Sequence, residues 1–470
     1  MLSRRHLMRS ATLGAASLLP LWYVEESLSQ PAPPAPKGAN DKPGILLIGC
    51  GGQGRGDAKS ASRFGDVVAV CDVDERRVAD AVADFPRAKR YRDFRKAVAD
   101  KDVDLAVNGT PDHWHTLVNL HVMRQGKDVY SEKPLTLTID EGRRLVEEAK
   151  KTGRILQTGS QQRSERGFRL ACELVRNGRI GRLRRVLVAL PAGRHDGPFE
   201  PEPVPEWLDW DFWQGQAPAT EYVPQRCHGT FRYWWEYSAG TITDWGAHHL
   251  DIAQWGIGAD GSGPTSVVTQ ELTRPVPGGF TTPADYWIEY EYADGVRVTC
   301  LSTRADEWEG RQRRRPQGRG QRQDGNREEP RRDEPRRREG QRQELPHRPG
   351  LIRNGVRFEG DDGWIFVTRG RIAASDPDLL EQPLVSGAQR LYASDDHMGN
   401  FFECVRTRKA PICAPEIGHR SVTLCHLAGI SARLGRRLKW DPAKEQFVGD
   451  EEANGMVARE MRKPWSYETV

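Results

Sequence analysis

Residues 49–54 read Gly49-Cys50-Gly51-Gly52-Gln53-Gly54, a G-x-G-x-x-G pattern that directly follows the apolar run 45–48. A helical pattern begins immediately after it, so the pattern occupies a strand–turn–helix unit. In such a unit the first glycine permits a tight turn, the second lets the backbone approach a pyrophosphate, and the third lets the helix pack close to the strand. The stretch therefore predicts a parallel α/β fold with a dinucleotide site contacted by Gly49, Gly51, Gly52, Gln53 and Gly54.

A second signal lies at the end of the next apolar run, where Asp72 stands 18 residues past Gly54. A carboxylate at this place accepts hydrogen bonds from the adenosine ribose and repels a 2′-phosphate. Asp72 therefore favours NAD over NADP, although Arg76 and Arg77 leave NADP as the less favoured alternative. A glycine-rich turn with an unrelated aspartate is the other interpretation.

The first part of the chain alternates short apolar runs with helical patterns. The runs predict strands at 45–48, 67–70, 105–107, 128–130 and 155–156, and the intervening segments predict helices at 53–64, 75–84, 93–99, 113–125 and 139–152. Alternating strands and helices with short links are typical of a doubly wound parallel sheet. We therefore assign residues 39–158 to an N-terminal domain of this kind.

The pattern changes near residue 159, where longer β-rich runs replace the alternation. A helix at 165–177 is followed by predicted strands at 183–190, 286–292, 296–301, 356–359 and 364–368, and then by helices at 396–407 and 416–435. Short connections between strands indicate antiparallel pairing. Residues 159–440 are thus expected to form a C-terminal α+β domain with a large, mostly antiparallel sheet, followed by a tail at 441–470.

An arginine-rich insertion at 304–350 interrupts this second domain. Residues 311–348 hold 14 arginines and 7 acidic residues, so this segment accounts for the net charge of +4 of the 470-residue chain. Its composition buries too little apolar surface to offset the entropy of ordering, which predicts a disordered loop. A basic tract can also bind nucleic acid, but the interspersed acids and near-absence of aromatic residues favour a solvated loop with no nucleic-acid partner.

The N-terminus carries the features of an export signal. Arg4-Arg5 precedes a weakly apolar run, 11–24, that is too short for a comfortable membrane span. A twin arginine before such a run is typical of proteins exported in the folded state. We expect residues 1–38 to be a twin-arginine signal with a Pro-rich linker, the export machinery to be a partner, the protein to be periplasmic or otherwise exported, and no membrane span to remain after processing. A chance Arg-Arg pair in a disordered tail is the alternative.

The eight cysteines contain no C-x-x-C pair and no spacing typical of a metal site. Four of them sit in apolar or glycine-rich runs, as buried thiols do: Cys50, Cys71, Cys300 and Cys425. We therefore predict neither a metal centre nor a disulfide framework.

Polar residues follow the third and fourth predicted strands of the first domain. Thr110-Pro111 would border the dinucleotide, and His115, or with less support His113, would face the nicotinamide. In the alternative, Asp112 caps the next helix and its neighbours are core residues. Glu132-Lys133-Pro134 ends the following strand, and the proline restrains the backbone of Lys133. Its ammonium would point over the crevice.

The segment 240–251 holds the second candidate cluster. If 244–255 is helical, Asp244 and His248 are four residues apart and share one face. A carboxylate that holds an imidazole suits the removal of a proton from an alcohol while hydride leaves the same carbon. The alternative is a capping aspartate and a buried structural histidine. His249 points about 100° away around the helix, and the aromatic run 231–237 suits either stacking on a sugar ring or an interdomain core.

The motifs in this order, Gly-x-Gly-x-x-Gly, Thr-Pro-x-x-x-His, Glu-Lys-Pro and Asp-x-x-x-His, resemble the Gfo/Idh/MocA oxidoreductase family over residues 43–440. The resemblance implies a Rossmann domain with NAD, followed by an α/β domain whose open sheet face often forms dimer or tetramer contacts. Lys133 would bind the reacting hydroxyl, His248 would be the acid/base, and Asp244 would bind substrate or orient the histidine. Glu132 would border the cofactor, and the candidate substrate contacts are Gln161, Arg163, Tyr233, Trp235 and His249.

The resemblance also implies a sugar, an inositol or a sugar derivative as substrate. Outside the cytoplasm no pool of free NAD is available for exchange, so an exported member would keep its cofactor bound. Three functions remain open at this stage. They are net or two-substrate oxidoreduction of the glucose–fructose type, a redox-neutral cycle that cleaves or epimerises a glycoside, and a non-catalytic sugar-binding protein.

Overall fold

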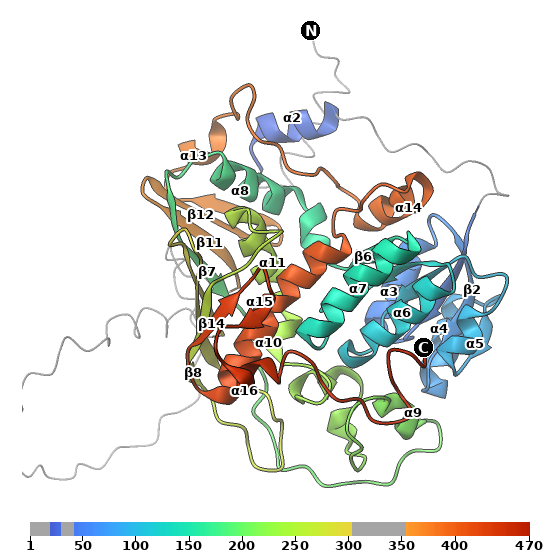
Figure 1. Ribbon diagram of the computed structural model, residues 1–470. Helices are drawn as coiled ribbons and strands as arrows, with labels where there is room; N and C mark the ends of the chain where they lie inside the picture. Colours follow the sequence, from blue (N-terminus) through green and yellow to red (C-terminus); the bar gives the residue numbers. More distant parts are fainter. Residues whose placement is uncertain (1–18, 30–41, 303–353) are drawn as a thin grey trace, which may run out of the picture.

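The computed structural model describes residues 19–29, 42–302 and 354–470. Its first sheet is parallel throughout and has the strand order β3-β2-β1-β4-β5-β6 (Figure 1). The strands are β1 (Gly44–Ile48), β2 (Asp66–Cys71), β3 (Lys89–Tyr91), β4 (Leu105–Asn108), β5 (Asp128–Ser131) and β6 (Leu156–Thr158). This order reverses between β1 and β4, so the connections that follow these two strands run in opposite directions and leave a crevice at the carboxyl ends of the strands.

Helices cover both faces of this sheet, as expected for a doubly wound fold. They are α3 (Gly52–Ala61), α4 (Glu75–Asp84), α5 (Phe94–Val98), α6 (His115–Arg124) and α7 (Ile139–Thr152). Helix α7 begins with a capping box, in which the Thr138 hydroxyl accepts from Glu141 N while the Glu141 carboxylate accepts from Thr138 N. The predicted helices agree with these bounds to within a few residues. Strand β3 was not predicted, because three exposed or half-exposed residues carry no apolar pattern.

The second sheet is mixed and has the order β13-β12-β11-β7-β10-β9-β8-β14-β15. Its strands are β7 (Leu183–Ala189), β8 (Ser266–Leu272), β9 (Tyr286–Glu291), β10 (Arg297–Leu301), β11 (Gly355–Gly360), β12 (Gly363–Thr368), β13 (Arg371–Ala374), β14 (Leu438–Asp441) and β15 (Gln446–Phe447). Only β7 and β10 pair in parallel; all its other described pairs are antiparallel. The predicted fold class is therefore confirmed.

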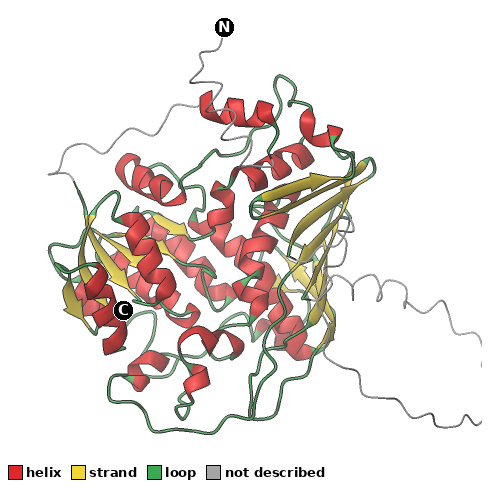
Figure 2. Cartoon of the chain, turned by 180° about the vertical axis from the view of Figure 1, so that it is seen from behind, coloured by secondary structure: helices red, strands yellow, loops and turns green. Residues whose placement is uncertain are grey.

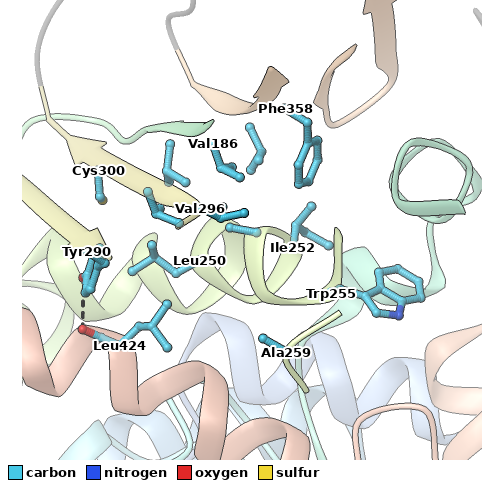
Figure 3. Packing of buried hydrophobic residues seen from close by; sticks show 14 of the residues in the cluster. Val186, Leu250, Ile252, Trp255, Ala259, Tyr290, Val296, Cys300, Phe358 and Leu424 are labelled. Atoms are coloured by element: carbon cyan, nitrogen blue, oxygen red, sulfur yellow. Dashed lines mark hydrogen bonds between the residues drawn. The ribbon is translucent and has the colours of Figure 1, made fainter. Parts of the chain in front are cut away.

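The core of the second domain lies between this sheet and three helices, α8 (Arg166–Arg176), α11 (Gly246–Ile257) and α15 (Pro415–Leu434). Figure 3 shows Val186 and Phe358 of the sheet facing Leu250 and Ile252 of α11. The Tyr290 hydroxyl donates to the Leu424 carbonyl of α15 at 3.0 Å. Helix α15 also packs against α7 of the first domain, which ties the two domains together.

The N-terminal segment differs from the expectation of a signal and linker over 1–38. Residues 21–29 form helix α2 (Leu21–Ser29), which lies on the second domain (Figure 1). Tyr23 is only 2% exposed and its hydroxyl accepts from Arg169 at 2.7 Å. Glu26 pairs with Arg390. The apolar run that resembles a signal therefore also supplies a packed helix, whereas the twin arginine and the insertion 304–350 lie outside the described residues.

The C-terminal residues after α16 (Glu451–Asn454) return to the first domain. Met461, Trp465 and Tyr467 pack on the core beside Phe94 and Trp114, and Figure 2 shows the C-terminus next to the helices of that domain. All eight cysteines are buried and free, and burial had been predicted for four of them, Cys50, Cys71, Cys300 and Cys425. Within the described ranges, no helix is long and apolar enough to cross a membrane. The same residues contain no group of three or more His, Cys, Asp or Glu side chains placed to hold a metal ion.

Candidate active site

A cavity of about 280 Å³ opens at the carboxyl ends of β1, β2 and β4. Its walls come from the glycine-rich turn, the β2–α4 link, the residues after β4 and β5, and two segments of the second domain. Residues that line it include Gly49, Gly51, Gly52, Gln53, Gly54, Asp72, Asp74, Arg77, Arg92, Thr110, Pro111, Asp112, Glu132, Lys133, His228 and Arg232. Ten of the residues predicted to contact the cofactor are thus gathered in one cleft.

The glycines of the turn either exclude a side chain or leave open space toward the cavity, as their pattern predicts. Gly49 has φ +86°, and a Cβ on Gly54 would lie 2.1 Å from the Gly49 carbonyl oxygen, so both positions exclude a side chain. Gly51 and Gly52, by contrast, have open space where a Cβ would lie. The turn therefore presents bare backbone and the N-terminus of α3 to the cavity, which fits a pyrophosphate.

Asp72 stands at the end of β2 and is fixed by the backbone around it. Its carboxylate accepts from Cys50 N at 2.7 Å and from Asp74 N at 3.0 Å. A carboxylate has about four acceptor positions, so it can still receive ribose hydroxyls. Burial raises the pKa of Asp72 to about 6.

The same end of the cavity holds groups that were not predicted from the sequence. Asp74 caps α4 and its carboxylate lies 3.4 Å from His228 Nε2. The Arg76 guanidinium lies 3.1 Å from the centroid of the Trp207 ring. Arg76, one of the two arginines that had left NADP open, is therefore held on an aromatic face. The two carboxylates at this end, Asp72 and Asp74, favour a ribose without a 2′-phosphate.

Lys133, at the other end of the cavity, forms a cluster with Asp244 and Arg232. Lys133 Nζ donates to Asp244 Oδ1 at 2.8 Å, and Arg232 Nε donates to the same oxygen at 3.2 Å. Burial disfavours the Asp244 carboxylate, but the two cations outweigh this effect and hold its pKa below the usual value. The segment after β5 and the segment 231–244 of the second domain thus meet in one charged cluster.

The predicted pairing of Asp244 with His248 is wrong. The expected helix over 244–255 is divided at Trp245 into α10 (Thr241–Asp244) and α11. Because Lys133 and Arg232 bind the Asp244 carboxylate, it is turned away from the imidazole. Among the described residues, His248 Nε2 has Arg369 Nη2 as its partner, at 3.3 Å.

His248 is 5% exposed and packs against Trp245. Burial lowers its pKa well below the usual value, and the positive charges of Lys133 and Arg369 lower it further. The imidazole is therefore neutral near pH 7, the state in which it can accept a proton. Its Nδ1 is buried and has no partner among the described residues.

The two histidines after β4 do not reach the cavity. His115 is 1% exposed, and its ring nitrogens lie 2.7 Å and 2.8 Å from the carbonyl oxygens of Pro134 and Thr110. His115 thus tethers the two strand ends instead of facing the nicotinamide. His113 is fully buried against Trp213 and Tyr237.

Two candidate substrate residues are structural. Arg163 is 1% exposed and binds Asp251 and Asp260 with hydrogen bonds of 2.7–3.2 Å, so its charge is satisfied inside the second domain. His249 is fully buried, and its Nε2 lies 2.7 Å from Asn354 Oδ1. Neither side chain lines the cavity, because Arg163 in the turn 161–164 is bound to Asp251 of α11, and His249 of α11 lies inside the domain.

The remaining candidates occupy other places. Tyr233 packs on Phe280, and Trp235 packs against α15 in a second, separate cavity. Neither lines the cofactor cleft, which corrects their assignment to it. Gln161 donates to Glu132 Oε1 at 2.7 Å, so it holds a residue of the cleft wall from behind. Burial raises the pKa of Glu132.

Three site residues were not predicted from the sequence. Arg232 lies inside the aromatic run that had been considered for stacking or for an interdomain core, Asp112 had been considered only as a cap, and Arg369 lies in the β12–β13 turn. Asp112 is 3% exposed and accepts from Ser238 Oγ at 2.5 Å. Arg232 is the one basic residue of the run 231–237, which was the signal that could have indicated it.

Comparison with known proteins places these features in a family. The sequence model of the Gfo/Idh/MocA oxidoreductase family's NAD-binding Rossmann fold matches residues 44–160. The model of the C-terminal alpha/beta domain of the same family matches 192–311 and 354–467. The two together account for about three quarters of the chain.

Curated relatives match in shorter stretches. A glycosyl hydrolase family 109 protein of Shewanella pealeana is 28% identical over 202 residues, which is 39% of this chain and 44% of the relative. A myo-inositol 2-dehydrogenase of Thermotoga maritima is 31% identical over 140 residues, which is 29% of this chain and 42% of the relative. The chain thus spans less than half the length of these relatives.

Solved structures share the fold along most of the chain. The WlbA dehydrogenase of Bordetella pertussis, in complex with NADH and UDP-GlcNAcA, has a TM-score of 0.58 and 18% identity, covering 85% of this chain and 99% of that one. A levoglucosan dehydrogenase in complex with NADH and levoglucosan has a TM-score of 0.55 and 15% identity, covering 85% and 99%. At these identities the likeness concerns the fold. With its NAD-binding glycine turn, its mixed second sheet and both family models matched, the chain belongs to the Gfo/Idh/MocA family of oxidoreductases.

Proposed function

We propose that the protein oxidises or reduces a carbon of a sugar, an inositol or a sugar derivative, with NAD held in the cleft beside Lys133. The observation that carries this proposal is that Lys133 and Arg232, which both bind Asp244, line the same cavity as the glycine-rich turn. NAD supplies a hydride acceptor or donor when bound. The neighbours that bind levoglucosan or UDP-GlcNAcA support the choice of a sugar-type substrate.

The residues of the chain divide the remaining work. The Lys133 ammonium binds the oxygen of the reacting hydroxyl and stabilises the negative charge that develops there. Neutral His248 accepts the hydroxyl proton and returns it in the reverse direction. Asp244 holds Lys133 in place, because Lys133 Nζ donates to its carboxylate at 2.8 Å and to its carbonyl oxygen at 3.2 Å. An ammonium has three donors, so one is left for a substrate oxygen. Arg232 shares the Asp244 carboxylate.

Export through the twin-arginine pathway remains part of this proposal. If the protein acts outside the cytoplasm, NAD cannot be replenished there and is expected to remain in the cleft. A two-substrate cycle or a redox-neutral cycle would then regenerate it. The match to a glycosyl hydrolase family 109 protein favours the redox-neutral cycle as the second candidate function.

Purified protein is expected to contain near-stoichiometric nicotinamide dinucleotide. The cofactor would be released by denaturing the protein and quantified by chromatography. Protein that carries none, and that also fails to bind added NAD, would sink the proposal of a resident cofactor. Protein that binds added NAD and releases it readily would support ordinary dehydrogenation.

The affinity for NAD is expected to fall as the pH is lowered through about 6. Burial raises the pKa of Asp72 to about 6, so the carboxylate that accepts ribose hydroxyls is lost by protonation below that value and is intact above it. The loss is expected to be about tenfold, the size of a hydrogen bond to a charged group. Calorimetric titration with NAD between pH 5 and pH 8 measures it. The Asp72→Asn variant should show no such dependence, and a flat profile for the unmodified protein would contradict the role of Asp72.

A homo-oligomer, dimer or tetramer, is also part of the proposal. The helices α8, α11 and α15 lie on one face of the second sheet, and the views in Figures 1 and 2 show no described helix on the other. A broad sheet face that no described helix covers suits contact with a second copy. Sedimentation of the purified protein measures the number of chains.

A further inference from the structure

A second cavity, of about 170 Å³, lies between the two domains and is separate from the glycine-rich turn. Thr136 and Thr138 line it from the first domain, Trp235 and His426 from the second, and Arg433 and Arg459 complete its wall. Three parts of the chain that are far apart in sequence thus enclose it. The C-terminal segment that contributes Arg459 runs back from α16 toward the first domain (Figure 1).

The two arginines are not satisfied by carboxylates. Within the residues that the structure describes, neither guanidinium has an acidic group within ion-pair distance, although 24 other described arginines do. Arg459 Nη1 donates to the Glu236 carbonyl at 2.6 Å, but its Nη2 is buried and has no partner. Arg433 Nε donates only to the Gly429 carbonyl, at 3.3 Å.

The surroundings disfavour the charge of both guanidinium groups. Burial and the neighbouring Arg459 lower the pKa of Arg433 to about 10, and burial lowers that of Arg459 although the charges of Glu141 and Glu236 act in the opposite direction. The buried Arg459 Nη2 without a partner and the second cation beside it are both costly, and a bound anion relieves both. His426 remains neutral because burial lowers its pKa to about 3, so it adds no charge.

One acidic group, Asp112, also lines this cavity, and it would oppose an anion. Its carboxylate is 3% exposed and accepts from Ser238 Oγ at 2.5 Å. Burial raises its pKa to about 6, which reduces the cost of bringing a second negative charge near it. With two cations against this single carboxylate, the cavity wall is net positive.

We propose that this cavity is a second binding site, for a small phosphate-bearing anion held between Arg459 and Arg433. Arg459 Nη2 donates from the buried side and Arg433 closes the exposed edge, while the Thr136 and Thr138 segment provides polar walls. The volume is below the roughly 300–1,000 Å³ of drug-sized ligand pockets, so the ligand is inorganic phosphate or a short phosphate ester and not a nucleotide. Trp235, predicted for stacking on a sugar, lies on this cavity's wall instead.

The position of this site connects it to both halves of the catalytic cluster. Thr136 follows Lys133 by three residues, and Thr243, which also lines the cavity, immediately precedes Asp244. A ligand here contacts both segments at once and holds the two domains in the arrangement that brings Lys133 to Asp244.

The test is a calorimetric titration of the NAD-saturated protein with inorganic phosphate and, in a second arm, with glycerol 3-phosphate. Saturating NAD blocks the glycine-rich turn, the other place where phosphate could bind, and equal ionic strength is kept with sodium chloride. We expect saturable binding that Arg459→Gln weakens about 10- to 100-fold, the effect of removing a hydrogen bond from a charged donor. Preference for one of the two probes identifies the free ion or the ester as the ligand class.

Two further variants keep the result interpretable. Arg433 lies at the exposed edge, so Arg433→Gln should fold normally and also weaken binding. The matched control is Lys439→Gln, which changes an exposed lysine of β14 and should leave binding unchanged. Binding of neither probe, or equal binding by the protein and both arginine variants, would overturn the proposal. A separate NAD titration shows whether the cofactor proposal fails independently of this one.

Discussion

Replacing Lys133 by Met is expected to lower the turnover number about 10³-fold while leaving the protein folded and able to bind NAD. The ammonium belongs to the segment that follows β5, and it lies 2.8 Å from Asp244 Oδ1. Removing a preorganised donor from the charge that develops on a substrate oxygen costs about 10²–10³-fold in rate. Loss of the lysine also leaves Asp244 paired only with Arg232.

The measurement needs a control for cofactor binding, because Lys133 lines the cleft. NAD affinity of Lys133→Met, by fluorescence or calorimetry, should remain within about tenfold of the original value. Lys96→Met removes an exposed lysine from the same domain and should behave as the unmodified protein. Full turnover by Lys133→Met with any accepted substrate would rule out its assigned role.

Replacing His248 by Asn is expected to lower turnover about 10²- to 10⁴-fold, the usual contribution of a general acid/base. Burial and the charges of Lys133 and Arg369 lower the pKa of this imidazole well below its usual value. The base form is therefore present across neutral pH, and the rate of the unmodified protein should fall only on the acid side. Asn has similar size and can still accept a hydrogen bond from Arg369, so folding should be retained.

Arg369→Gln separates a catalytic from a structural role for His248. Removing this cation raises the pKa of His248, because one of the charges that disfavour the imidazolium is lost. The acid limb of the pH–rate profile should then move toward neutral pH, with the plateau rate affected less than in His248→Asn. If the acid limb stays where it is in Arg369→Gln and also persists in His248→Asn, a different group is titrating.

The fold could be predicted well because its signals are local. The glycine turn, the alternation of short apolar runs and the αL glycine at 435 each depend on a few neighbouring residues. Several missed elements lacked such signals: β3 is short and charged, and β14 and β15 are two to four residues long. Strand β8 is different, because it contains the apolar pair Val267-Val268 and was still not predicted. Helix α2 was not predicted, because the apolar run 11–24 was assigned to an export signal, an assignment that stays a prediction.

The site was predicted less completely because its pairings are set by tertiary contacts. Spacing placed Asp244 and His248 on one helical face, but the helix is divided at Trp245, and Lys133 and Arg232 take the carboxylate. Arg163 was assigned to the substrate pocket on the basis of the family resemblance. Its burial with Asp251 and Asp260 depends on where α11 packs, which no local pattern indicates.

The reduced-nicotinamide absorbance of the NAD-loaded protein, followed as sugars, inositols and glycosides are added one at a time, tests the central claim most directly. Products are analysed in parallel, and Lys133→Met is run beside the unmodified protein. The account predicts that at least one of these compounds transfers hydride to the bound NAD, seen as a rise in absorbance or, when the cofactor is regenerated within the cycle, as product formed with NAD unchanged overall. In both cases Lys133→Met should fail to respond. NAD bound in the cleft with no absorbance change and no product from the whole panel would contradict it, and would favour a protein that binds sugars without converting them.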